Sequence, residues 1–437
     1  MTGRPDLVLV GGAVLDGDGR YYARRNVAIQ AGRITAVWDP AGGSPWLQAE
    51  QVLDCTGCLI TPGLTVLHGH APMALFRGLA EDVAIDDWFN RRIWPYESRI
   101  TPDDVYHGAR LAIAEMIENG VTAFADHYMH AGRIADAVVE TGIRADLAPT
   151  IFGLGDGVEE QIEAAAALIA LRRFESPRLT FRMGPHAPYT CPPPVLKAIV
   201  DRARELGVGI HLHVSETEAQ VAASRSGEGR TPFQAVADAG GFTLPVLVAH
   251  GLWVEEEDLA LLTPETWFAA SPKTYLKLAM GEGNLWRLRE RLNVAIGTDG
   301  AASSNTLNPL EQARLWALVG KHATGRADRF TLAEAWQLLM NGHRALATPT
   351  GMVVSGLDAD LVVWDLQQPN TAPVLDPLAA LLYSAESRNV RDVMVQGQFL
   401  KRNFRVVSLD TAEAVSRAVA AAQRLLAEGP GRAGVVY

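Results

Sequence analysis

Several residue types are scarce in this sequence, and their scarcity narrows what the chain can be. Cysteine occurs three times in 437 residues, at Cys55, Cys58 and Cys191, an odd number that gives no disulfide framework and fits a reducing compartment. Lysine is absent before Lys197, so arginine carries nearly all of the positive charge. No apolar run reaches the length of a membrane span, and the first residues do not resemble a signal peptide. We therefore expect a cytoplasmic protein.

The charge balance is acidic, with a formal net charge of -11. A partner with a phosphate backbone or an anionic membrane surface would require clustered lysine and arginine. We therefore expect no nucleic-acid partner and no membrane partner, and a small molecule is the favoured ligand. The chain is 48% hydrophobic and 20% charged, which gives it ample material for one large domain with an accessory domain.

Short apolar strands alternate with amphipathic helical stretches through residues 62–347. PPVLKAIVDRARELG precedes VGIHLH, for example, and NLWRLRERL precedes NVAIGTD. Eight strand candidates end near His68, Asp126, Phe152, His186, His213, His250, Ser271 and Asp299. This alternation predicts an α/β fold in which eight parallel strands form a closed (β/α)8 TIM barrel. A doubly wound open sheet is the rival, but the glycine-rich segment GLGDG has the wrong spacing for a nucleotide turn.

The two ends of the chain have a different hydrophobic pattern from the middle. Residues 6–39 alternate apolar and polar positions between glycine-rich turns, and the same pattern returns in DADLVVWDL and VRDVMVQGQFLKRNFRVV. We interpret residues 1–61 and 348–437 as one small β-sandwich domain built from both chain ends, with a terminal helix from Asp410 to about Glu428. The Cys55-Thr56-Gly57-Cys58 segment is interpreted as a turn into the next strand, because no second cysteine pair accompanies it.

Side chains that can bind metal stand at the ends of the predicted strands. The five are His68, His70, His213, His250 and Asp299. Chemistry in such barrels takes place at the C-terminal ends of the strands, so these residues are expected to converge. Residues i and i+2 share a face of a strand, which points His68 and His70 inward together and places His211 in the packed layer beneath His213. A single histidine of this kind is more often a core residue bonded to a carbonyl, but the recurrence favours a metal site.

The segments PGLTVLHGHAPM, HLHVSE, VLVAHG and GTDGAAS resemble the amidohydrolase superfamily. They are similar to its mononuclear branch of cytosine, guanine, adenosine and S-adenosylhomocysteine deaminases and triazine hydrolases. The resemblance implies one divalent metal ion, zinc rather than iron, held by His68, His70, His213 and Asp299. It also implies that Glu216 shuttles protons and that His250 contacts the attacking water or the substrate. Binuclear relatives use a carboxylated lysine on the fourth strand, where this chain has His186 and no nearby lysine.

This resemblance implies a hydrolytic mechanism. Metal-bound hydroxide attacks the ring carbon that bears the leaving group, Asp299 accepts the proton of the bound water, and Glu216 protonates a ring nitrogen as general acid. We expect a metal-dependent deaminase of an aminated nitrogen heterocycle, purine- or nucleoside-like or related. The alternatives are a triazine-type hydrolase that expels chloride or alkylamine, a cyclic amidine or amide hydrolase, and a non-enzymatic scaffold. Homodimers are common among such barrels.

By the same resemblance, the substrate-binding positions are Trp88, Glu97, His186 and Ser303. Each has an ordinary structural alternative: a core-edge aromatic for Trp88, a solvated residue for Glu97 and a helix cap for Ser303.

Two segments depart from the nucleoside subgroup. IFGLGDG lacks the arginine of that subgroup, and SPKTYLKLAMG has Thr274 and Tyr275 where the subgroup usually has other residues. A heterocycle smaller than a nucleoside therefore remains an alternative substrate. His127 and His130 follow the second strand and either line the pocket or form its polar rim.

Overall fold

The computed structural model describes residues 4–42 and 49–431, and two parallel sheets lie at the centre of this mixed α/β fold. The first sheet has five strands, in the order β10-β8-β7-β6 with β9 beside β8. They are β6 (Leu64–Val66), β7 (Val121–Tyr128), β8 (Arg144–Ile151), β9 (Leu179–Phe181) and β10 (Gly184–Pro185). The second sheet has four strands in chain order: β11 (Ile210–Val214), β12 (Val246–His250), β13 (Thr266–Ala270) and β14 (Asn293–Ile296). The strands of both sheets lie where the alternation of apolar runs predicted eight strands, with the fourth predicted strand divided between β9 and β10.

The two parallel sheets are hydrogen-bonded to each other at both edges. At one edge Met183 pairs with Ile210 in a parallel bridge, and the amide of His213 donates to the carbonyl of His186 at 3.0 Å. At the other edge the amide of Leu67 donates to the carbonyl of Ile296 at 2.8 Å. The outermost strands of one sheet therefore lie against those of the other.

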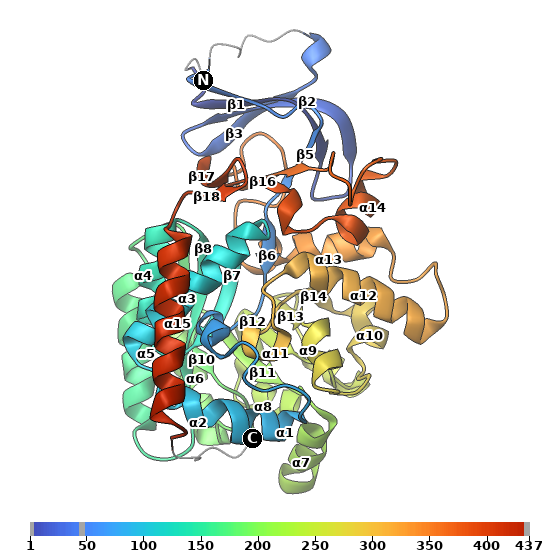
Figure 1. Cartoon of the computed structure of the whole chain (residues 1–437). Helices are drawn as coiled ribbons and strands as arrows, with labels where there is room; N and C mark the ends of the chain where they lie inside the picture. Colours follow the sequence, from blue (N-terminus) through green and yellow to red (C-terminus); the bar gives the residue numbers. More distant parts are fainter. Residues whose placement is uncertain (1–3, 43–48, 432–437) are drawn as a thin grey trace.

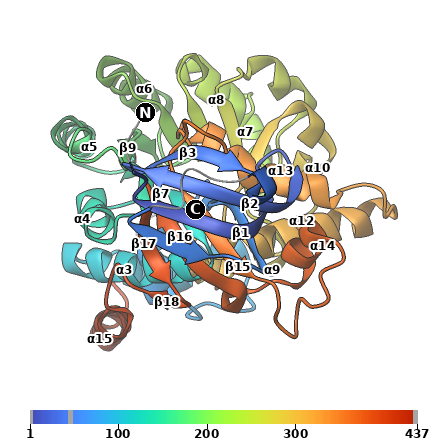
Figure 2. The same cartoon turned by 90° about the horizontal axis from the view of Figure 1, so that it is seen from above.

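Helices surround the parallel strands, as the view from above shows (Figure 2). The long ones are α3 (Pro102–Glu118), α4 (Ala131–Thr141), α5 (Val158–Arg172), α6 (Pro193–Leu206), α7 (Glu218–Glu228), α12 (Pro309–Thr324) and α13 (Leu332–Ala345). The short ones are α1 (Ile85–Asp87), α2 (Trp94–Glu97), α8 (Pro232–Asp238), α9 (Pro272–Lys277), α10 (Leu285–Leu288), α11 (Ala301–Ser304) and α14 (Pro377–Ala379). No helix among the described residues is both long and apolar enough to cross a bilayer.

Local sequence explains the start and the buried face of α3. Thr101 and Asp104 form a reciprocal capping box, and Pro102 occupies the first turn, where it costs no helical hydrogen bond. Ile113 and Ile117, one turn apart, are fully buried against the strands and belong to the large hydrophobic cluster that joins helices to the outer faces of both parallel sheets.

The inner faces of the parallel strands carry unusually small residues. Ala123, Ala125, Ala269 and Ala295 form a separate buried cluster together with Leu67 and a few larger side chains. His127 continues the face of Ala123 and Ala125, because alternate residues of a strand point the same way. The small residues leave room inside the strand layer for a group of imidazoles.

Strands from both ends of the chain form a third, nine-stranded sheet (Figure 1). Its order is β18-β17-β16-β15-β5-β1-β2-β3, and β4 pairs with β1. The strands are β1 (Leu7–Leu15), β2 (Tyr21–Gln30), β3 (Arg33–Trp38), β4 (Gln51–Asp54), β5 (Cys58–Pro62), β15 (Leu361–Asp365), β16 (Val390–Val395), β17 (Gln398–Arg402) and β18 (Arg405–Val406). The joining of both ends agrees with the alternation seen in the sequence, and so does the terminal helix α15 (Thr411–Glu428). The pairings of this sheet are antiparallel except those of β1 with β4 and with β5, which are parallel.

A buried ion network connects the first parallel sheet to the segment before β15. Arg144, at the start of β8, donates to Asp360 at 2.6 Å and to Asp358 at 2.7 Å. We expect Arg144→Met to destabilise the protein by about 3–5 kcal/mol, because it leaves Asp360 buried without its cation and Asp358 paired only with the exposed Arg33. Urea unfolding followed by circular dichroism measures this loss. The exposed pair Arg326–Asp328 supplies the control, since Arg326→Met should change stability by less than about 1 kcal/mol. Equal midpoints for the two variants would contradict the prediction.

Candidate active site

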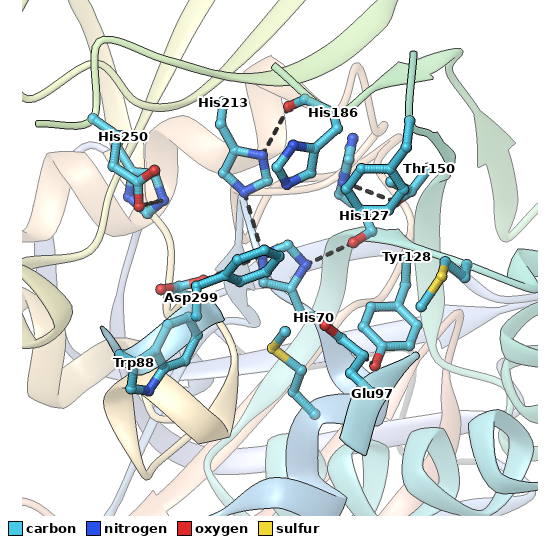
Figure 3. Close-up of a pocket in the computed structure, with 15 residues that line it drawn as sticks. His70, Trp88, Glu97, His127, Tyr128, Thr150, His186, His213, His250 and Asp299 are labelled. Carbon is cyan, nitrogen blue, oxygen red and sulfur yellow. Dashed lines mark hydrogen bonds and ion pairs between the residues drawn. The ribbon is translucent and has the colours of Figure 1, made fainter. Parts of the chain in front are cut away.

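Three of the predicted ligands, His70, His213 and Asp299, converge at the ends of the parallel strands (Figure 3), and His68 lies beside them. His70 Nε2 lies 3.3 Å from Asp299 Oδ1 and 3.3 Å from His213 Nε2. His68 Nε2 lies 3.6 Å from the same oxygen of Asp299. Candidate ligand atoms of His68, His70 and Asp299 all lie within 4.8 Å of one another, as do those of His68, His213 and His250.

Hydrogen bonds to backbone carbonyls define the proton positions on two of these imidazoles. His70 Nδ1 lies 2.6 Å from the carbonyl oxygen of His127, and His213 Nδ1 lies 3.0 Å from that of His186. A carbonyl accepts only, so both Nδ1 atoms carry a proton, and in the neutral form of each ring the Nε2 atom presents a lone pair. Burial lowers the pKa of His213 to about 4, which keeps its ring neutral near pH 7. Two lone pairs that face each other at 3.3 Å, beside a carboxylate, form a donor set suited to a divalent cation.

A third imidazole adds a donor to the same place. His68 Nε2 is buried and has no hydrogen-bond partner, although it points toward Asp299. Its Nδ1 lies 2.9 Å from Nε2 of His211, which is fully buried one layer below His213, as expected. His211 therefore supports a candidate ligand and does not belong to the candidate ligand set itself.

Asp299 and His250 both adopt a left-handed backbone where their strands end. Their φ angles are 59° and 65°, a conformation that residues other than glycine rarely adopt. Asp299 directs Oδ1 toward the histidines, while Oδ2 lies 2.6 Å from Ser303 Oγ and 3.1 Å from Thr274 Oγ1. Strained conformations of this kind concentrate at functional sites.

Glu216 lies between the end of β11 and the N-terminus of α7 and is buried. Its Oε1 is 3.5 Å from His250 Nε2, and Gln220 Nε2 donates to its other oxygen at 3.4 Å. Burial lowers the pKa of His250 to about 4, so a neutral imidazole faces this carboxyl group. The pair can hold or transfer a proton beside the histidine cluster.

One pocket, with an empty volume of about 520 Å³, contains these groups. Away from the histidine cluster its wall is aromatic and apolar, with Trp88, Phe89, Phe152, Met73 and Met129. The described residues that line it include no lysine or arginine. The pocket therefore suits an uncharged aromatic molecule.

A buried carboxyl group also lines this pocket. Glu97, at the end of α2, accepts a hydrogen bond of 2.6 Å from the hydroxyl of Tyr128 on β7, and both side chains are buried. Burial raises the pKa of Glu97 to about 7, and the bond from Tyr128 acts in the opposite direction. Glu97 can therefore accept hydrogen bonds from a ligand at neutral pH, and less well in acid.

The other residues singled out from the sequence divide into two groups. Trp88, His186 and His127 line the pocket with Glu97. His186 Nδ1 lies 2.8 Å from Thr190 Oγ1, and His127 Nδ1 lies 3.0 Å from Thr150 Oγ1.

Ser303, His130 and Tyr275 lie outside the wall of this pocket. Ser303 donates a hydrogen bond to Oδ2 of Asp299, the oxygen that does not face the histidines. His130 is exposed, and the ring of Tyr275 packs against His250 with centroids 5.7 Å apart. The expected contact between Ser303 and the substrate stays a prediction. Tyr128 and Thr274 received no role from the sequence; the altered SPKTYLK segment was the one signal for Thr274.

Comparison with known proteins adds a family and named relatives. A profile described as "Amidohydrolase family" matches residues 59–400. A protein named 5-methylthioadenosine/S-adenosylhomocysteine deaminase from Desulforudis audaxviator is 38% identical over 412 residues, which cover 92% of this chain and 95% of the relative. A 5'-deoxyadenosine deaminase from Methanosarcina mazei is 34% identical over 430 residues, with 97% and 99% covered. A solved adenosine deaminase from Xanthomonas campestris with bound zinc superimposes with a TM-score of 0.92 at 28% identity, with 97% and 99% covered.

Proposed function

The chain belongs to the amidohydrolase family, and we propose that it hydrolytically deaminates an aminated nitrogen heterocycle, with adenosine-like nucleosides as the first candidates. The observation that carries this proposal is the convergence of His68, His70, His213 and Asp299 beside Glu216 in one pocket. Deaminases are named among relatives that align over nearly the whole chain. The family resemblance expected from the sequence motifs is confirmed by these matches.

For the architecture, we propose that the two parallel sheets form one closed (β/α)8 barrel over residues 62–347. The hydrogen bonds at both sheet edges support this closure. We further propose that residues 1–61 and 348–437 form a β-sandwich domain with a C-terminal helix. A hydrophobic cluster that combines Leu9 and Ile29 with Leu361 and Met394 supports a shared core for the two chain ends.

The enzyme depends on a divalent metal ion, which fits the donor atoms of the histidine cluster. We propose a single ion, zinc in preference to iron, held by His68, His70, His213 and Asp299. When bound, such an ion supplies a water that ionises near neutral pH and acts as the nucleophile. Bound zinc in the solved adenosine deaminase supports the choice of metal, and His186 on the fourth strand, in place of a lysine, supports the choice of one ion.

In the proposed reaction, Glu216 moves the protons. Water adds to the ring carbon that bears the amino group, and the ring C=N bond opens toward its nitrogen. The carboxyl of Glu216 delivers a proton to that nitrogen as general acid. The amino group gains the proton of the added hydroxyl and its C–N bond breaks, while the other proton of the water returns to Glu216. The products are a ring carbonyl and ammonia. The neutral imidazole of His250, 3.5 Å from Glu216, orients the oxygen that is added.

Trp88, Glu97 and His186 bind the substrate in this proposal. All three line the pocket, and Trp88 is fixed by a hydrogen bond of 3.3 Å from its indole nitrogen to the carbonyl of Ala302. An aromatic face of this kind stacks on a planar heterocycle, while Glu97 accepts hydrogen bonds from sugar hydroxyls. Ser303 stays a candidate contact to the base.

The experiment is an ammonia-release assay on protein of measured zinc content, with adenosine, 5'-deoxyadenosine, methylthioadenosine and guanine as substrates. Ammonia equal in amount to the deaminated product is expected from at least one nucleoside. Chloride or alkylamine released from substituted triazines, without ammonia from purines, would instead support the alternative hydrolase. Metal-loaded protein that releases no leaving group from either panel would contradict both.

We also propose a cytoplasmic homodimer with a small molecule, and no nucleic acid, as its partner. The net charge of -11 disfavours a polyanion, and the described cysteines are free thiols, as in a reducing compartment. Light scattering of the purified protein tests the dimer, and cell fractionation tests the location.

The Glu97–Tyr128 pair predicts a pH dependence of nucleoside binding. Because the pKa of Glu97 is raised to about 7, the carboxylate that accepts from sugar hydroxyls predominates at pH 8 and is mostly protonated at pH 6. We expect KM for adenosine to rise about tenfold from pH 8 to pH 6. Tyr128→Phe removes a bond that lowers this pKa, so the midpoint should shift to higher pH. A KM that does not change with pH in either protein would contradict the prediction. The control substrate is 2',3'-dideoxyadenosine, which lacks the 2'- and 3'-hydroxyls of the sugar.

A further inference from the structure

We propose that Thr274 and Ser303 are positioning residues that hold the carboxylate of Asp299 in one orientation. Ser303 Oγ lies 2.6 Å and Thr274 Oγ1 lies 3.1 Å from the same oxygen, Oδ2 of Asp299. The two hydroxyl oxygens are 3.4 Å from each other, and all three side chains are buried. The inference rests on the proposed function, because it concerns a ligand of the proposed metal site.

The two hydroxyls reach Asp299 from separate elements that are joined to each other. Thr274 belongs to α9, and Ser303 belongs to α11. Two lysines of α9 bind the residues just after α11: Lys277 Nζ donates to Asn305 Oδ1 at 2.6 Å, and Lys273 Nζ donates to Thr306 Oγ1 at 3.0 Å. The spacing of α9 and α11 is therefore maintained by contacts that do not involve Asp299. The hydroxyls form a preformed cradle for its Oδ2.

This cradle distinguishes the two oxygens of the carboxylate. Oδ2 accepts both hydroxyl protons, while Oδ1 faces the imidazoles of His68 and His70 at 3.6 and 3.3 Å. Rotation of the carboxylate toward the histidine cluster would break hydrogen bonds to a charged acceptor, which are stronger than those between neutral groups. Asp299 is therefore held so that one oxygen is presented to the proposed ion.

In this role Thr274 and Ser303 act through Asp299, and Thr274 has no proposed contact with the substrate. Neither side chain lines the pocket that contains the other candidate residues. Groups that orient a metal ligand from outside the ligand set commonly change metal affinity or activity by about 10- to 100-fold when removed. The same magnitude is expected here.

The test compares Thr274→Val, which keeps the shape and removes the hydroxyl, with Thr274→Ser, which restores a hydroxyl. Thr141→Val is the matched control, because Thr141 is a buried threonine on α4 whose hydroxyl bonds only the backbone carbonyls of Ala137 and Val138. For each protein, kcat and KM for ammonia release are measured, and zinc affinity is measured separately by competition with a chromogenic chelator.

Thr274→Val should lower kcat and zinc affinity by about 10- to 100-fold each with KM within about twofold of wild type. Thr274→Ser should recover most of both losses, and Thr141→Val should show neither. Ser303→Ala should reproduce the pattern, and it carries the test if Thr274→Val does not fold.

Zinc affinity and kcat of Thr274→Val that both equal those of Thr141→Val would overturn the proposal. A rise in KM at unchanged kcat would overturn it too, because it would place these hydroxyls on the substrate. Weaker zinc binding in Thr274→Val, in a protein whose wild type releases no ammonia, would support the cradle and contradict the proposed function. Failure of the cradle proposal can therefore be distinguished from failure of the proposed function.

Discussion

Glu216→Gln lowers ammonia release from the best nucleoside substrate by about 10²- to 10⁴-fold, the usual range for loss of a general acid. Glutamine is isosteric but has no proton to deliver to the ring nitrogen, so the substrate still enters the pocket and the ring nitrogen stays unprotonated. Glu216 lies outside the proposed ligand set, and we therefore expect the zinc content of the variant to equal that of wild type. The measurement combines kcat from the ammonia assay with metal analysis of the same preparation.

The chain offers a close control for this substitution. Glu218 stands two residues further along, in the first turn of α7, and is exposed. Glu218→Gln makes the same chemical change outside the pocket and should leave kcat within about twofold of wild type. Loss of zinc in Glu216→Gln would show that the carboxyl group acts as a ligand, and undiminished activity would remove it from the reaction altogether.

The convergence of the proposed ligands could be predicted from the sequence, because parallel strands that end at one face of the fold bring together side chains that are far apart in the chain. His68, His213 and Asp299 each end or follow a buried apolar run, and parallel strands bring their carboxyl ends to one face. The alternation within β11 was sufficient to place His211 one layer below His213, where the structure has it. The placement of residues that depends only on the alternation along a strand and on the order of the strands could therefore be predicted from the sequence.

Other features depend on contacts that no local pattern records. The hydroxyl of Tyr128 meets Glu97 across 31 residues, and the cradle of Thr274 and Ser303 depends on how α9 and α11 pack. The parallel pairing of β1 with β4 and β5 likewise arises from packing between distant segments, since alternation along a strand does not encode the direction of its neighbour. These contacts and pairings are set by tertiary packing and could not be predicted from the local sequence.

Removal of the metal is expected to abolish turnover and to lower the thermal stability of the protein. Without the ion, the Nε2 atoms of His70 and His213 lie 3.3 Å apart beside the carboxylate of Asp299, and the positive charge that the ion would supply there is missing. A ligand that binds the folded state alone stabilises it by about 4 kcal/mol when its free concentration is a thousandfold above Kd. Calorimetry of the chelator-treated protein, before and after zinc is returned, measures this difference together with recovered kcat.

The number of zinc equivalents needed for recovery, together with two histidine variants, tests whether the effect arises at the proposed site. If the proposed donor set holds a single ion, one equivalent of zinc should restore both activity and the melting temperature. His213→Gln removes a proposed ligand and should prevent both recoveries, whereas His130→Gln alters an exposed histidine outside the pocket and should behave as wild type. A requirement for a second equivalent would indicate a binuclear centre. Full activity in protein shown to be metal-free would contradict the shared role of these imidazoles, since nothing else described in the pocket ionises a water near pH 7.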